Sequence, residues 1–401
     1  MTRDDGVIGS SLNSLYVDTD GSLLVSDMLT GIVRYDPFAA PSSTPHFEVL
    51  APQPASAMIR APGGDLFLAG PDGLRKLGAL DLVEPGATDV RQAAIGADGI
   101  LWFAASNGVW SMDSTGFSQF TTQHGLPSDR VSGLLPRNDG SLVVVSGVQD
   151  GGAAIFDGER FQRLRVGGNR LVRADCRDVT EDANGHLWIA TDEGVFRTDG
   201  TAWIMLNERD GLPESFANQV HATADGSVWI GLRNDGAARY RPTRLSPPKP
   251  VVSVVTDGGL DSQRGAWSVT AGQRASFAFD AIDFYTPVEK RQYRWQVFQG
   301  SLDDKGLAAN WGTPGTRTEV ERTFEKPGDW TLAVQYIDRD LNYSEPEFVK
   351  IHVVLPWHAN AAVMAPLGAG ALGLLGWALF ARLLYVRKRR EASALREKML
   401  E

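Results

Sequence analysis

One short pattern recurs through residues 1–244 and constrains the fold more than any other feature of the sequence. Each copy has a turn ending in glycine, a short apolar strand that often contains tryptophan, and a second glycine turn before another apolar strand. The leading glycines are about 36 to 45 residues apart, a spacing that indicates a repeat fold. The first apolar strands of the six copies are LLV at 23–25, LFL at 66–68, LWF at 101–103, LVV at 142–144, LWI at 187–189 and VWI at 228–230.

The fifth copy shows most clearly how one repeat divides into strands, because turns at Asn184-Gly185 and Gly194 separate its apolar segments. A single four-stranded sheet of this size cannot bury both of its faces, whereas radial packing of several such sheets can. The sequence therefore predicts a β-propeller of about six four-stranded repeats in residues 1–244. The strands expected for the fifth copy are 177–180, 186–190, 195–197 and 202–206.

The connectors between repeats carry a motif of their own. Two are alike, HGLP at 124–127 and DGLP at 210–213, and DGVI at 5–8 is a weaker relative. Together with the strand pattern, these connectors resemble the two-component regulator propeller repeats of bacterial receptors. Members of that family commonly carry more repeats and a signal peptide, so the resemblance implies a chain that is incomplete at its N-terminus. A self-contained six-bladed propeller is the alternative.

A different pattern begins after a proline-rich stretch. Pro247, Pro248 and Pro250 make residues 245–250 a stiff linker. Beyond this linker the repeat is lost, and residues 251–355 contain about seven short segments in which apolar and polar residues alternate. That number and spacing predict an immunoglobulin-like β-sandwich.

Aromatic residues in this second region carry a further resemblance. They are Tyr293, Trp295, Trp311, Phe324, Trp330 and Tyr343, with PGD at 327–329 and SEP at 344–346. The set is similar to the Y_Y_Y domain, although Trp330 stands where that family usually has tyrosine. In the same receptors this domain follows the propeller and leads into the membrane, so the resemblance implies that order of parts here.

Residues 359–381 form an uncharged run rich in alanine, leucine and glycine. As a helix these 23 residues span roughly 35 Å, enough to cross a hydrocarbon core of about 30 Å. Trp357 and Tyr385 flank the run, and four basic residues follow at 387–390. By the positive-inside rule, the sequence predicts one transmembrane helix, with residues 382–401 in the cytoplasm and the β-rich part outside.

Two features of the C-terminal part favour a homodimer. Ala365, Ala369 and Gly373 form a stripe of small residues that suits close approach of two membrane helices, with plain lipid-facing residues as the alternative. Residues 382–401 have high helix propensity and the beginning of an apolar seam, as at the start of a parallel signalling helix. The GxGxxG string at 368–373 does not indicate a dinucleotide site, because no strand precedes it.

The sequence contains no recognisable catalytic, metal or cofactor motif. Cys176 is the only cysteine, which excludes an internal disulfide, and the six histidines lack metal-ligand spacing. Residues 338–342 copy the first half of a calcium loop but lack its glycine and its closing glutamate. The net charge of −10 argues against nucleic-acid binding. We therefore expect no catalytic residue, no metal, no cofactor and no enzymatic activity within these residues.

These features predict the sensory and transmitting part of a bacterial two-component receptor in the inner membrane, with a periplasmic propeller and sandwich. An external ligand, with saccharides among the candidates, controls a cytoplasmic output. By resemblance that output is a histidine kinase beyond residue 401, which acts on a response regulator. The alternatives are a diguanylate cyclase or transcription-factor output, a membrane-tethered propeller lyase or hydrolase, and an adhesion scaffold.

Overall fold

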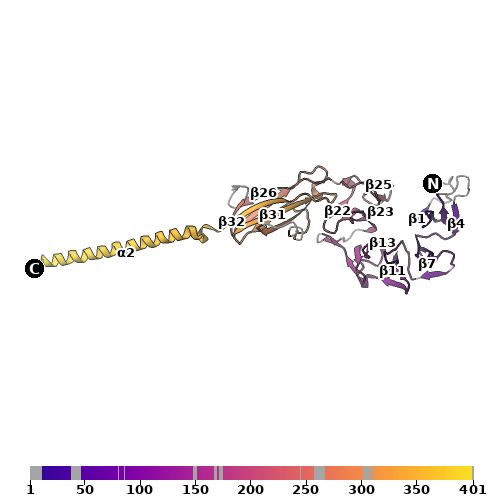
Figure 1. Ribbon diagram of the computed structural model, residues 1–401, viewed down its shortest axis with the longest axis horizontal. Coiled ribbons are helices and arrows are strands. Elements are labelled where there is room, and N and C mark those ends of the chain that lie inside the picture. The colour runs from indigo at the N-terminus through magenta and orange to yellow at the C-terminus, as the bar shows by residue number, and fades with distance from the viewer. Residues whose placement is uncertain are drawn as a thin grey trace.

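The computed structural model describes residues 11–37, 47–79, 81–84, 86–147, 151–166, 169–170, 175–243, 245–256, 267–300, 306 and 310–399. Figure 1 shows an array of small β-sheets at the N-terminal end, a second group of strands beside it, and one long helix that projects from this second group. The helix is α2 (Ala361–Lys398). This all-β architecture followed by a single long helix confirms the predicted fold class.

Six antiparallel sheets, here called blades 1 to 6, follow one another in the propeller part. Blades 1 to 5 have four strands each, and blade 6 has three strands among the described residues. A small hairpin, β17 (Arg165–Val166) and β18 (Asn169–Arg170), stands between blades 4 and 5 in the chain. The strands are β1 (Leu12–Val17), β2 (Leu23–Asp27), β3 (Gly31–Tyr35) and β4 (Phe47–Ala51) in blade 1; β5 (Ala57–Arg60), β6 (Leu66–Gly70), β7 (Gly73–Lys76) and β8 (Leu82–Glu84) in blade 2; β9 (Gln92–Ile95), β10 (Leu101–Ala105), β11 (Gly108–Asp113) and β12 (Gly116–Phe120) in blade 3; β13 (Val131–Pro136), β14 (Leu142–Ser146), β15 (Gly152–Phe156) and β16 (Phe161–Arg163) in blade 4; β19 (Cys176–Glu181), β20 (Leu187–Thr191), β21 (Gly194–Thr198) and β22 (Trp203–Leu206) in blade 5; and β23 (Ala217–Ala222), β24 (Val228–Leu232) and β25 (Ala237–Tyr240) in blade 6.

The alternation of side chains along the second strand of each blade explains how the blades stack. In β10, Leu101 and Phe103 pack with blade 2, whereas Trp102 packs with blade 4. In β20, Ile189 packs with blade 4 and Trp188 with blade 6. Because neighbouring side chains of a strand point to opposite faces, the recurring LW pattern supplies one apolar residue to each adjacent blade.

Close packing requires the glycine that opens the third strand in blades 3 and 5. Gly108 and Gly194 have φ angles of 129° and 145°. A Cβ atom at either position would lie 2.3 Å from a backbone oxygen of the outer strand, that of Phe120 or Leu206. Only glycine accepts this backbone geometry at so short a distance, which accounts for the second glycine of the sequence repeat.

The outward faces of the first and last blades carry exposed apolar side chains. On β1, Leu15 and Val17 are 61% and 68% exposed, and on β24 Trp229 is 44% exposed. Trp188, which occupies the position of Trp229 in blade 5, is fully buried against the next blade. Blades 1 and 6 therefore do not pack against each other through these side chains.

The seven strands described after the linker form two sheets. One has the order β26-β28-β30, and the other has the order β27-β32-β31-β29, in which β27 runs parallel to β32. Between them lie Phe277, Tyr293, Leu332 and Tyr336, each at most 2% exposed, as the predicted immunoglobulin-like sandwich requires. The strands are β26 (Val251–Thr256), β27 (Trp267–Thr270), β28 (Arg274–Asp280), β29 (Gln292–Gln299), β30 (Glu319–Thr323), β31 (Gly328–Ile337) and β32 (Glu347–Val354).

Strand β32 leads almost directly into the C-terminal helix. Residues 355–360, which include the short turn η6 (Trp357–Ala359), are all that separate the strand from α2. The stretch Ala361–Arg396 contains a window with a mean hydropathy of 1.7, and none of that window is buried. Among the described residues this is the one helix that is long and apolar enough to cross a membrane.

Candidate functional site

The loop that joins β31 to β32 leaves the sandwich and packs into the propeller. Ile337 and Leu341 are 0% and 4% exposed and join the apolar core of blades 5 and 6, which includes Trp188 and Ile230. Leu341 has a φ of 57°, a left-handed conformation that is uncommon outside glycine, asparagine and aspartate. We call residues 337–343 the coupling loop.

A carboxylate in the coupling loop accepts three hydrogen bonds from the end of blade 6. Asp340 accepts from the Tyr240 hydroxyl at 2.7 Å, from the Thr243 backbone N–H at 3.0 Å and from the Thr243 hydroxyl at 2.5 Å. Tyr240 is the last residue of β25, and Thr243 follows it closely. Because Asp340 is buried, these hydrogen bonds replace the water that its charge loses on folding.

Arg197 is the buried positive charge that faces Asp340. Its guanidinium donates to the Asp340 carbonyl oxygen at 2.8 Å and lies 3.5 Å from the Asp340 carboxylate. The same guanidinium lies 3.8 Å from the Asp182 carboxylate and 4.6 Å from the centre of the Trp188 ring. Two carboxylates and an aromatic face thus compensate a cation that would be costly to bury alone.

His186 adds a titratable group to this network. The Arg197 guanidinium donates to His186 Nδ1 at 2.9 Å, which requires that nitrogen to be unprotonated. Burial lowers the pKa of His186, and the nearby charge of Arg197 lowers it further. We call the contact between the coupling loop and blades 5 and 6 the junction. In the folded chain the junction therefore favours the neutral imidazole of His186.

Residues 338–342, which copy the first half of a calcium loop, make up most of the coupling loop. The Asp338 carboxylate accepts from the Asp340 N–H at 2.8 Å and from the Asn342 N–H and side-chain amide at 2.9 Å each. Burial raises the pKa of Asp338. Within the described part of the chain, no group of three or more His, Cys, Asp or Glu side chains is arranged to hold a metal ion. Asp338 thus holds the shape of the loop.

An aromatic contact fixes the end of the coupling loop. The Tyr343 hydroxyl donates to the Asp199 carboxylate of blade 5 at 2.6 Å. The Arg294 guanidinium, on β29, lies 4.5 Å from the centre of the Tyr343 ring and 4.8 Å from that of Trp311. Tyr343 therefore links Asp199 of the propeller to Arg294 on β29 of the sandwich.

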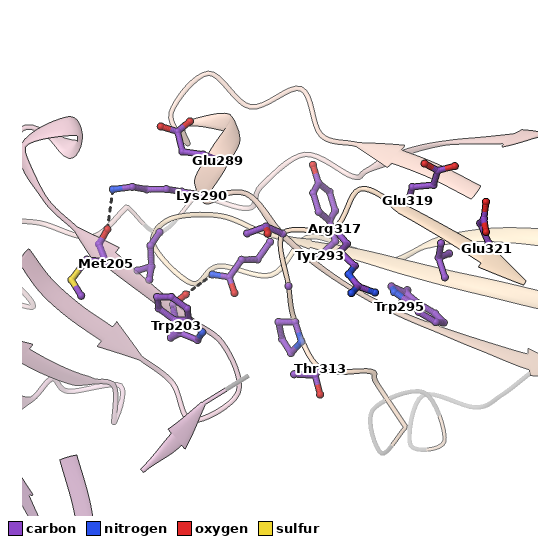
Figure 2. Close-up of a pocket in the computed structure, with 16 residues that line it drawn as sticks. Trp203, Met205, Glu289, Lys290, Tyr293, Trp295, Thr313, Arg317, Glu319 and Glu321 are labelled. Carbon is purple, nitrogen blue, oxygen red and sulfur yellow. Dashed lines mark hydrogen bonds between the residues drawn. The ribbon is translucent and has the colours of Figure 1, made fainter. Parts of the chain in front are cut away.

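A cleft of about 1290 Å³ opens between blade 5 and the sandwich. Figure 2 shows Trp203 and Met205 on the propeller side, and Tyr293, Trp295 and Arg317 on the sandwich side. The lining residues come from β22, from the turn η5 (Val288–Lys290), from β29, from the loop that leads into β30 and from β30 itself. They are Trp203, Ile204, Met205, Glu289, Lys290, Gln292, Tyr293, Trp295, Thr313, Pro314, Gly315, Thr316, Arg317, Glu319, Val320 and Glu321.

Lys290 closes one end of the cleft by binding the propeller. It donates to the Met205 carbonyl at 2.9 Å (Figure 2) and forms an ion pair with Asp210. Asp210 ends the turn η3 (Glu208–Asp210), and the DGLP connector starts at this residue. The connector motif of the sequence repeat is thus a docking point for the sandwich.

Sequence reasoning missed Arg197, although a signal for it exists. Arg34 and Arg239 occupy the equivalent strand positions in blades 1 and 6, and each pairs with the aspartate of its own DG turn, Asp20 or Asp225. In blade 5 that aspartate is replaced by Asn184. An arginine whose usual partner in the repeat is missing can be recognised from sequence. In the structure Arg197 pairs with Asp340 instead.

The three residues predicted for a helix–helix contact lie away from this junction. Ala365, Ala369 and Gly373 are on α2, and all three are exposed. Their role therefore stays a prediction.

Comparison with known proteins gave matches among solved structures. No protein-family model matches the chain, and no curated protein matches it. The extracellular domain of BT3049 from B. thetaiotaomicron, described as a hybrid two component system, is 18% identical with a TM-score of 0.49, over 87% of this chain and 51% of that one. The extracellular domain of BT4673, described likewise, is 14% identical with a TM-score of 0.45, over 86% of this chain and 51% of that one.

A propeller enzyme also matches. The gluconolactonase XC5397 from Xanthomonas campestris is 14% identical with a TM-score of 0.37, over 55% of this chain and 83% of that one. The chain spans about half the length of the two extracellular domains.

Proposed function

We propose that this chain is the sensing and transmitting part of a single-pass bacterial receptor of the two-component type. The propeller and sandwich lie in the periplasm, α2 crosses the inner membrane, and the basic residues after its apolar stretch enter the cytoplasm. The output controlled by the helix is a histidine kinase, and two copies of the chain associate through the helix.

One observation carries this proposal: the coupling loop and the membrane helix are attached to opposite ends of one strand. The coupling loop ends at residue 343, β32 occupies Glu347–Val354, and α2 begins at Ala361. Eight strand residues span roughly 26 Å at about 3.3 Å per residue. A change in how the propeller holds the loop is therefore passed to the helix through a hydrogen-bonded strand.

A ligand drives such a change only if its affinity differs between two arrangements of the junction. The junction suits this role because it combines an apolar insertion, Leu341, with a directional ion pair, Arg197 with Asp340. Packed interfaces of this kind switch between discrete arrangements instead of deforming continuously.

Cysteine labelling of the full chain in intact bacterial cells tests the proposed topology. Cys176 is fully buried, so it gives a low background with a membrane-impermeant maleimide. Ser114→Cys, in an exposed turn of blade 3, should react in intact cells. Ser393→Cys, near the end of α2, should react only after the cells are permeabilised.

Labelling at position 393 in intact cells, or protection at position 114, would contradict the proposal. Labelling of both cysteines in permeabilised cells is the control that each side chain is accessible. Loss of label from the membrane fraction would also contradict the proposal, because an unanchored chain cannot transmit a signal across the bilayer.

A further inference from the structure

The cleft between blade 5 and the sandwich has an aromatic side chain on each wall. Trp203, on β22, is half-buried, and its ring stacks on Phe196 with 5.5 Å between the centres. Trp295, on β29, is also half-buried and packs on the sandwich core. Figure 2 places these two indoles on opposite sides of the cleft. Two rigid aromatic surfaces facing one space can hold a flat ring between or against them.

The acidic groups that line the cleft already have partners. Glu289 forms an ion pair with Arg209 at 3.2 Å, and Glu321 forms one with Arg274 at 2.8 Å. Glu319 accepts a hydrogen bond from the Ser276 hydroxyl. Arginines therefore compensate Glu289 and Glu321, whereas Glu319 keeps its negative charge.

Of the two basic side chains that line the cleft, one has a charged partner and the other has none that the structure describes. Lys290 is paired with Asp210. Arg317 is exposed, and no ion pair or hydrogen bond joins its guanidinium to another residue of the described part of the chain. The cleft thus presents one guanidinium that has no partner among the described residues, on the wall that carries Trp295 (Figure 2).

The loop that carries Arg317 is held in place by the strand beneath it. The Gly312 N–H donates to the Trp295 carbonyl at 3.1 Å, and Gly315 exchanges two hydrogen bonds with Tyr293, of 2.8 Å and 3.0 Å. Pro314 is buried. A site that is already ordered loses less conformational freedom when a ligand binds.

From this geometry we propose that the cleft binds a small carboxylic acid whose carboxylate is joined to a six-membered ring with an apolar face, with Arg317 as the anchor of the carboxylate. The planar guanidinium matches a carboxylate in a two-point hydrogen-bonded pair, and the indole of Trp295 or Trp203 receives the ring face. This inference rests on the proposed receptor function, for which it names the class of ligand.

Isothermal titration of the full chain in lipid nanodiscs tests the proposal with two ring acids, benzoate and D-glucuronate. Their neutral analogues, benzyl alcohol and D-glucose, measure the part played by the carboxylate. At least one acid should bind at least about tenfold more tightly than its neutral analogue, as expected for a charge-assisted pair. Benzoate alone would identify aromatic acids as the ligand class, and glucuronate alone would identify sugar acids.

Two substitutions of exposed arginines provide matched variants. Arg317→Gln should weaken binding of the acid at least about tenfold, whereas Arg322→Gln, on β30 but outside the cleft, should change it less than about twofold. An unchanged thermal transition for both variants shows that both fold. The proposal is overturned if neither acid binds, if the neutral analogues bind equally well, or if Arg317→Gln has no effect.

The binding result is independent of the membrane topology. If cysteine labelling contradicts the receptor function, binding of a ring acid would still establish the cleft as a ligand site. If labelling supports the receptor and neither acid binds, only the assigned ligand class fails.

Discussion

Replacing Leu341 by alanine should separate the sandwich from the propeller. Leu341 is buried in the core of blades 5 and 6, and truncation of a buried leucine to alanine typically costs about 2–5 kcal/mol, from lost burial and from the cavity left behind. The φ of 57° adds a strain of roughly 1–2 kcal/mol that alanine keeps and glycine relieves. We therefore expect Leu341→Gly to destabilise the junction less than Leu341→Ala, the reverse of the usual order.

Hydrogen exchange of the Thr243 amide gives a direct measurement of this effect. That N–H donates to the Asp340 carboxylate and is released when the coupling loop withdraws. If withdrawal becomes easier by 2 kcal/mol or more, Thr243 should exchange at least about 30-fold faster in Leu341→Ala than in the wild-type chain. In calorimetry the sandwich and the last two blades should then unfold in separate transitions.

Leu245→Ala is the matched control, because Leu245 lies close to Thr243 in the chain but is 62% exposed. Its effect should stay within about 0.5 kcal/mol. The reasoning is refuted if Leu341→Ala changes the exchange of Thr243 less than about threefold, or if Leu341→Gly is the more damaging substitution.

Three further predictions follow from the junction and the helix. Arg197→Met should lower the free energy of unfolding by about 3–5 kcal/mol in urea titrations, because it leaves buried carboxylates uncompensated; a loss below 1 kcal/mol would contradict the ion-pair account. Because the folded-state pKa of His186 lies below its usual 6.5, the unfolded chain takes up the proton first, so stability should fall as the pH drops from about 6.5 to that lower pKa. His186→Gln should remove this part of the slope in thermal melts recorded across that range, and an unchanged slope would exclude His186 as its source. In detergent, Ala369→Leu should weaken association of the chain by roughly tenfold, whereas Ala371→Leu, on the opposite face of α2, should leave it unchanged in cross-linking assays.

Most of the fold could be predicted from the sequence because the repeat is local. The turn glycines and the short apolar second strands set each sheet without reference to distant residues, as blade 5 illustrates. The β-sandwich was predicted from its strand count, and α2 from its uncharged run. In each case a period or a length that is visible in a short window specifies the element.

The junction could not be predicted in the same way, because its contacts join residues far apart in the chain. Asp340 reaches Tyr240 across 100 residues, and Tyr343 reaches Asp199 across 144. Residues 338–342 copy half of a calcium loop because a carboxylate-rich turn has the same local pattern whether it binds a cation or its own backbone. Arg317 has no signal in the sequence, because its lack of a partner within the described residues depends on how the other charged residues of the cleft pair in the folded chain.

The coupling loop also sets the order in which the chain can finish folding. Blade 6 ends at Tyr240, but the core that it shares with blade 5 includes Ile337 and Leu341, about 100 residues later. At a synthesis rate of about 5–20 residues per second, the ribosome needs roughly 5–20 s to make that interval. During this time the last two blades expose an incomplete apolar core, so any factor that protects newly made chains must act before residue 341 emerges.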